Sequence, residues 1–163
     1  MEQEEMSILT QQGFSEAVSS LSTLLFSVSF SLLRDKEACA DAAQNAILHA
    51  WQKRGSLRDP KKFKSWIVRI TINECKTLLR GRSAVSLTED IPYESKSDDV
   101  KIDVNNAVHA LPVKYRLPIV LFYYEDMTIS EIADALKLPE GTVMSQLKRA
   151  REKLRKELLD YGN

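Results

Sequence analysis

Cysteine, histidine, glycine and proline are all scarce in this chain of 163 residues. Cys39 and Cys75 are isolated and only two His accompany them, so the ligand spacing of a zinc site is missing and the thiols fit a reducing compartment. The start MEQEE has no basic region of a signal peptide. The apolar stretch 21–33 is interrupted by Ser and Thr and is too short to span a bilayer. We therefore expect a cytoplasmic protein that binds no metal or cofactor and is not a membrane protein.

Catalytic patterns are missing as well. The chain has no paired carboxylates, no Ser/His/Asp order and no Gly-rich phosphate loop. Asp98, Asp99 and Asp103 are spaced loosely like metal ligands, but no Gly-centred loop holds them together, and we interpret them as solvated. The sequence therefore does not indicate an enzyme.

Charge is balanced overall but uneven along the chain. Residues 53–82 hold ten Lys/Arg against two Asp/Glu, and residues 141–163 hold six against three. The segment before the first block and the segments between the two blocks carry a net negative charge, so the formal net charge of the chain is zero. Two basic blocks indicate two contacts with a polyanion at different places along it. The alternative is that both blocks are ordinary solvated helix faces.

The hydrophobic pattern predicts an all-α fold with two small helical domains. In the first domain, residues 1–81, apolar residues recur at helical spacing over Phe14–Arg34 and Lys36–Arg54. Asp59-Pro60 is a typical helix start, and the third helix is expected to run to about Arg80. Gly81 would end this helix.

A flexible linker is predicted over residues 82–100, which are rich in Ser and acids and contain Pro92. The second domain, residues 101–163, would begin with a short helix and continue with the apolar helix Val113–Tyr124. Pro118 would kink that helix or start a new one. The run 117–124 also has the composition of a strand, but the helical patterns on both sides favour a helix.

The last third of the chain has the pattern of a helix-turn-helix. Thr128 and Glu131 form a T-x-x-E capping box, Pro139 suits the start of a second helix, and an apolar stripe follows from Val143 to Leu158. The other face of that second helix is small, polar and basic, as a helix in the major groove of DNA requires. The predicted DNA-binding residues on it are Gly141, Thr142, Ser145, Gln146, Lys148, Arg149 and Arg151. The alternative is a structural helical hairpin with a charged surface.

Several motifs resemble those of bacterial RNA polymerase sigma factors, specifically the extracytoplasmic-function class. Residues 41–51, DAAQNAILHAW, are similar to the family's D-L-V-Q-E-T-F-L-R-A-W segment. The third helix contains most of its F-x-x-W-L-x-R-I-x-x-N pattern, from Phe63 to Asn73. Leu111-Pro112 and the PEGTV turn match its C-terminal domain. The resemblance extends from Phe14 to Leu158.

The resemblance implies a promoter-specificity subunit with a region 2-like domain, a linker and a region 4-like domain. Contact with core polymerase would involve Gln44, Asn45, Leu48 and Trp51. The −10 element would be bound by Arg58, Lys61, Lys62, Lys64, Arg69 and Asn73. The −35 element would be read as duplex by the predicted DNA-binding face of the second domain. Family members are usually held by an anti-sigma factor, often membrane-anchored.

The chain departs from the family pattern in ways that affect these expectations. Asn45 replaces a usual acidic residue, so one polymerase contact would be neutral. Lys137 stands where the turn commonly has Gly, which would strain a left-handed backbone. Met144 and Gln146 replace residues that are often basic, which would weaken the −35 contact.

Other interpretations remain open at this point. Trp51 and Trp66 are alternatively core anchors, and Asn73 alternatively makes a structural hydrogen bond. A free-standing helix-turn-helix regulator is the alternative function, but it would normally need a dimerisation domain matched to paired half-sites.

Overall fold

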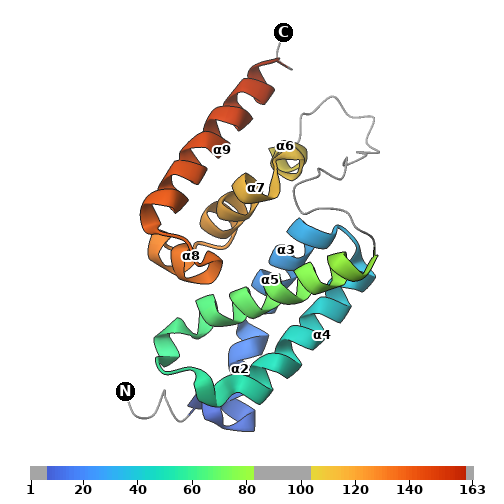
Figure 1. Ribbon diagram of the computed structural model, residues 1–163, viewed down its shortest axis with the longest axis vertical. Coiled ribbons are helices and arrows are strands. Elements are labelled where there is room, and N and C mark those ends of the chain that lie inside the picture. The colour runs from blue at the N-terminus through green and yellow to red at the C-terminus, as the bar shows by residue number, and fades with distance from the viewer. Residues whose placement is uncertain (1–6, 83–103, 161–163) are drawn as a thin grey trace.

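The computed structural model describes residues 7–82 and 104–160, and within them it contains helices and turns but no strand. The predicted all-α class is therefore confirmed. The helices form two groups, α2 to α5 and α6 to α9, which Figure 1 shows as two layers lying against each other.

The first group contains α2 (Gln11–Ser20), α3 (Ser22–Leu33), α4 (Lys36–Lys53) and α5 (Phe63–Arg82). Two short 3₁₀ turns, Arg54–Ser56 and Pro60–Lys62, connect α4 to α5. Helices α3, α4 and α5 pack on one another and enclose the core of this group. Asp59 caps the start of the last turn by accepting from the Lys61 amide at 3.0 Å, as its position before Pro60 predicts.

The single helix predicted over Phe14–Arg34 is wrong, because the chain bends by 57° at Leu21. Leu21 has φ −104° and ψ 6°, which lies outside the helical region. Its neighbour Ser20 turns its hydroxyl onto the carbonyl of Ala17 at 2.7 Å. Serine side chains compete in this way with the helical hydrogen-bond pattern, and this segment is rich in Ser.

Among the described residues, no single helix is long and apolar enough to cross a membrane. One pair of helices in the described ranges, α2 and α3 taken together across their bend, reaches the length and composition of a membrane span.

The second group contains α6 (Val104–Ala110), α7 (Val113–Ile119), a wide π-helical turn (Val120–Tyr124), α8 (Ile129–Leu136) and α9 (Glu140–Asp160). Pro118 does not break the α7 segment. Because Pro118 has no N–H, the carbonyl four residues earlier loses its usual donor. The chain then winds more widely, and the amide of Glu125 reaches the carbonyl of Val120 at 3.2 Å.

Helices α8 and α9 form the predicted helix-turn-helix. The capping box is present, with Thr128 accepting from the Glu131 amide at 3.2 Å and Glu131 accepting from the Thr128 amide at 2.9 Å. Lys137 ends α8 in the left-handed region, with φ 54° and ψ 48°, so the strain expected from a non-Gly residue there is present. Val143 and Leu147 fix α9 on the core.

The two groups pack directly on each other, which the sequence did not predict. Their buried residues form one continuous hydrophobic cluster, with α3 against α7 and α5 against α8. Arg116, which is 3% exposed, reaches from α7 to the carbonyl of Ser31 on α3. The linker predicted over residues 82–100 lies, apart from Arg82 at the end of α5, outside the described residues.

Candidate nucleic-acid interfaces

The outer face of α9 is a basic surface open to solvent. Gly141, Ser145, Lys148 and Arg149 are exposed and lie opposite the buried stripe that holds the helix on its domain. Thr142 borders this face and is half-buried. Because the face combines small residues near the helix start with cations further along, it can approach the edges of bases closely and also contact phosphates.

Arg149 also lies close to Tyr115 of α7. Its guanidinium lowers the pKa of that phenol, and the neighbouring Lys114 acts in the same direction. The amines of Lys114 and Lys153 lie 4.9 and 5.6 Å from the centre of the Tyr115 ring. The ring therefore attracts cations at the base of the outer face.

Gln146 and Arg151, also predicted to bind DNA, lie on opposite flanks of α9. The side-chain oxygen of Gln146 is buried without a hydrogen-bond partner and faces the first domain. Arg151 donates to the hydroxyl of Tyr123 at 3.2 Å, on the other side of the helix. The structure thus groups five of the seven predicted residues and separates these two from them.

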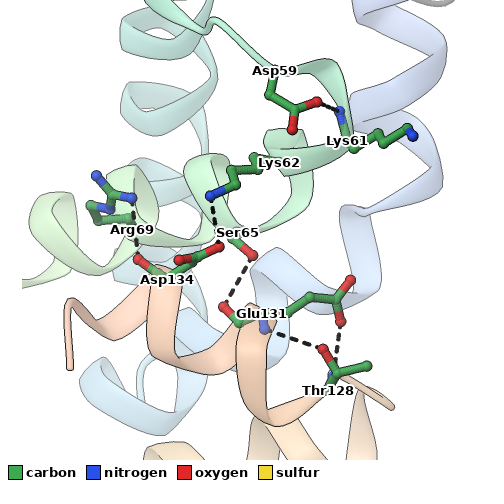
Figure 2. A network of polar contacts seen from close by, with 8 residues as sticks. All are labelled: Asp59, Lys61, Lys62, Ser65, Arg69, Thr128, Glu131 and Asp134. Atoms are coloured by element: carbon green, nitrogen blue, oxygen red, sulfur yellow. Dashed lines mark hydrogen bonds and ion pairs between the residues drawn. The ribbon is translucent and has the colours of Figure 1, made fainter. Parts of the chain in front are cut away.

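The basic side of α5 is partly covered by α8, as Figure 2 shows. Lys62, just before α5, forms an ion pair of 3.4 Å with Asp134. Ser65 donates to the carbonyl of Glu131 at 3.0 Å, and Arg69 donates to the carbonyl of Asp134 at 3.1 Å. Two of the six residues predicted to bind the −10 element, Lys62 and Arg69, are therefore in contact with the second domain.

The other four predicted residues of this set are distributed around that contact. Arg58, Lys61 and Asn73 are exposed, and Lys64 is half-buried. Asn73 lies one turn along α5 from Arg69 and lines the same cleft between the two domains. Ser65 was missed by the sequence analysis, because a small residue next to Trp66 gives no sign that it faces a second domain.

The cleft between the domains is positively charged. It has a volume of about 330 Å³, and its lining includes Arg69, Asn73, Lys76, Lys114, Lys137 and Gln146. None of the described residues that line it is acidic. The Nε of Arg69 is buried there without a hydrogen-bond partner.

Three of the four residues predicted to contact core polymerase share an apolar groove between α2 and α4. Gln44, Leu48 and Trp51 line this groove, which has a volume of about 560 Å³ and is bounded on the α2 side by Phe14 and Val18. Trp51 packs edge-on against Phe14 with 5.2 Å between ring centres, so it also serves as a core anchor. Asn45 is exposed but does not line the groove.

A second apolar groove, which the sequence analysis missed, lies along the inner side of α9. It has a volume of about 600 Å³ and is lined by residues of α6, the π-helical turn and α9, among them Val108, Tyr123, Tyr124, Leu154 and Leu158. Arg151 and Arg155 border it. Val104 and Leu159 are 52% and 60% exposed at this groove. The sequence did contain a sign of this groove. The apolar stripe of α9 extends to Leu158, and α9 is much longer than α7, so α7 cannot cover the whole stripe.

The part of the chain that the structure describes contains no group of three or more His, Cys, Asp or Glu side chains arranged to hold a metal ion. Cys39 and Cys75 are buried free thiols, and burial raises the pKa of each.

Comparison with known families identifies both halves of this architecture. The family model for Sigma-70 region 2 matches residues 17–85, and the model for Sigma-70, region 4 matches residues 102–154. The chain belongs to the sigma-70 family of RNA polymerase sigma factors. The first match contains α4 and the basic side of α5, which we term the α5 face (Lys62, Lys64, Arg69 and Asn73), and the second contains the helix-turn-helix.

Individual relatives place this sigma factor in the extracytoplasmic-function (ECF) class. It is 36% identical over 135 residues to the ECF RNA polymerase sigma factor SigM of Mycobacterium tuberculosis H37Rv, which covers 80% of this chain and 68% of the relative. It is 28% identical to the ECF RNA polymerase sigma factor SigW of Bacillus subtilis over 92% of this chain and 91% of the relative. A match at 27% identity to the probable RNA polymerase sigma factor RfaY of Xanthomonas campestris spans only 41% of that longer relative.

A solved structure supports the fold of this sigma factor. The structure of CnrH in complex with the cytosolic domain of CnrY superposes with a TM-score of 0.71 over 99% of this chain and 95% of that chain, at 24% identity. As a sigma factor, the protein acts with core RNA polymerase in promoter-specific initiation, and the free-standing regulator is not favoured.

Proposed function

We propose that this sigma factor engages a promoter through three surfaces assigned by residue: the α2–α4 groove to core polymerase, the α5 face to the −10 element, and the outer face of α9 to the −35 element. The proposal includes the division into residues 1–81, 82–100 and 101–163, a cytoplasmic location, and no catalytic activity of its own. The observation that carries it is the outer face of α9, where small residues and cations lie together on the solvent side of a helix-turn-helix.

The −35 element suits this face because the element is double-stranded. A helix enters the major groove, and its side chains read base edges while cations contact phosphates. Arg149, which is exposed on this face, would contact a base edge or a phosphate. Ser145 and Lys148 are its exposed neighbours on the same face.

The −10 element requires a different surface, because the family opens the duplex there. Unstacking a base costs a few kcal/mol, and a basic surface with polar side chains offsets this cost by binding the single strand. Lys62, Lys64, Arg69 and Asn73 lie along one stretch of α5 and the turn before it. Arg58 and Lys61, both exposed, add charge beside that stretch.

An anti-sigma factor is the second proposed partner. The related CnrH was solved in complex with the cytosolic domain of CnrY. The inner groove of α9, which is apolar with Arg151 and Arg155 at its border, offers such a partner a place for an amphipathic helix.

Transcription in vitro with core polymerase over a randomised promoter library tests the function, and variants test the residues. We expect enrichment of promoters with two separated elements. We expect Arg149→Ala to reduce initiation about tenfold or more on a −35-dependent promoter, because a good base or phosphate contact contributes about 1–3 kcal/mol. Lys156→Ala, an exposed cation further along α9, is the matched control. Equal initiation by these two variants would remove Arg149 from the −35 surface.

A further inference from the structure

We propose that α8 is an intramolecular ligand of the α5 face, and that it covers the −10 surface while leaving the −35 surface open. This inference rests on the proposed function of these two surfaces. It adds that, in the free protein, one of the two DNA-binding surfaces is covered and the other is accessible.

The contacts between α8 and α5 resemble those that a nucleic-acid backbone would make. Lys62 pairs with a carboxylate oxygen of Asp134, and Ser65 and Arg69 donate to main-chain carbonyls of α8 (Figure 2). All three partners are oxygen acceptors, the same kind of group that phosphates present to Lys, Ser and Arg. Helix α8 and a single strand would therefore compete for the same donors.

The outer face of α9, in contrast, stays exposed to solvent. Ser145, Lys148 and Arg149 are exposed in the same arrangement in which Lys62 and Arg69 are engaged. Since α8 supports α9 from behind, α8 can lie on α5 without covering the outer face of α9. The closed molecule can therefore contact duplex DNA through α9, but it cannot present the whole α5 face to a single strand.

The interface between α8 and α5 is built to open. Its ion pair joins side chains that are 59% and 40% exposed, and such pairs contribute little. Beside it lies the cationic cleft, where the Nε of Arg69 and the side-chain oxygen of Gln146 are buried without partners. Unpaired buried polar atoms and imperfect packing both oppose closure. The α3–α7 contact, with buried Arg116, holds the domains together at the other end of the interface.

The test compares two charge reversals in the full-length protein. Asp134→Arg places a cation next to Lys62 and should lift α8 from α5. Asp41→Arg, at an exposed position on α4, makes the same change in net charge away from the interface. Each variant is titrated with a fluorescent single-stranded oligonucleotide and with the same sequence as a duplex, after circular dichroism confirms the helical content.

We expect Asp134→Arg to bind the single strand about tenfold more tightly than Asp41→Arg does, because a surface that is about one-tenth available in the free protein becomes available throughout. We expect the two variants to bind the duplex equally within about twofold. Equal single-strand affinities would overturn the masking, and an equal gain for duplex and single strand would overturn its one-sidedness.

A milder variant, Asp134→Asn, keeps the test valid if the charge reversal prevents folding. It removes the ion pair without introducing a cation, so a smaller gain in single-strand affinity is expected, and no gain counts against the proposal. Promoter-directed initiation by the wild-type protein with core polymerase distinguishes a failure of the masking from a failure of the proposed function. If initiation is normal while Asp134→Arg and Asp41→Arg bind the single strand alike, only the masking fails. If the wild type gives no promoter-directed initiation, the proposed function itself fails.

Discussion

The guanidinium of Arg116 on α7 donates to the main-chain carbonyl of Ser31 on α3, so a buried side chain of one domain completes the hydrogen bonding of the other. The same side chain also donates to the carbonyl of Leu111 through Nε at 3.1 Å and Nη2 at 2.8 Å. The buried guanidinium thus donates to one carbonyl in each domain. The stability of the second domain is therefore coupled to its contact with the first domain.

Replacing Arg116 by Leu should lower the free energy of unfolding by about 2–3 kcal/mol, because buried carbonyls lose charged donors and have no water to replace them. Urea unfolding followed by circular dichroism measures this loss. Lys156→Leu, at an exposed position of α9, provides a control that should change stability by less than about 0.5 kcal/mol. A loss below that value for Arg116→Leu would show that the carbonyls find other donors.

The capping box of α8 gives a second prediction. Thr128→Ala removes the acceptor for the Glu131 amide and should cost about 1 kcal/mol of stability. Thr128→Ser retains the hydroxyl and should stay close to the wild type. Thermal unfolding of the three proteins under one buffer condition compares them, and equal midpoints for Ala and Ser would contradict the role of the cap.

Lys137 gives a prediction of the opposite sign. Because its backbone is left-handed, with φ 54°, Lys137→Gly should raise stability by about 0.5–1 kcal/mol. Lys137→Ala loses the same side chain but keeps the Cβ that disfavours this conformation. Only the Gly variant should therefore unfold at a higher urea concentration, and a matching gain for Ala would assign the effect to the lysine side chain.

The proposed role of the α2–α4 groove predicts that Leu48 is a sensitive position for polymerase binding. Its side chain is 53% exposed at the groove, and Leu48→Ala should weaken binding of core polymerase about tenfold, as expected for loss of an apolar anchor. Leu159→Ala removes an equally large exposed side chain at the end of α9. Fluorescence anisotropy with labelled sigma factor and core enzyme compares the two, and equal affinities would exclude Leu48 from the contact.

Cys75 predicts how stability changes at alkaline pH. Burial raises the pKa of its thiol from 9.0 to about 11, so the unfolded chain releases this proton at lower pH than the folded protein. The contribution is fully present below pH 9.0 and is lost as the pH rises from 9.0 through about 11. As the pH rises over that window, the free energy of unfolding of the wild type should fall by up to about 2 kcal/mol more than that of Cys75→Ala. Urea unfolding at a series of pH values measures this difference. Parallel pH dependences would show that the thiol does not titrate as its burial implies.

The helix-turn-helix could be predicted in detail because its signals are local. The capping box, the turn and the apolar stripe of α9 each depend on residues within one or two turns of one another. The same holds for the start of α5 at Asp59-Pro60. Local patterns of this kind determine the elements whatever the other domain does.

The packing of the two domains could not be predicted, because its determinants are spread over the chain. Ser65 and Glu131 are 66 residues apart, and Arg116 and Ser31 are 85 residues apart. In both contacts the acceptor is a main-chain carbonyl, a group that every residue has, so the sequence does not show which residue will accept the bond. The bend at Leu21 was missed for a related reason, since apolar spacing continues across it at almost the helical period.

That bend has a consequence for how the α2–α4 groove could vary among related chains. Helix α2 reaches over α4 only because the backbone changes direction at Leu21, so the width of the groove is governed by torsion angles at its far edge. Substitution of Gln44 or Leu48 would change the chemical groups that line the groove, while the width of the groove would stay the same. The chemistry of the groove lining and the width of the groove can therefore change independently of each other.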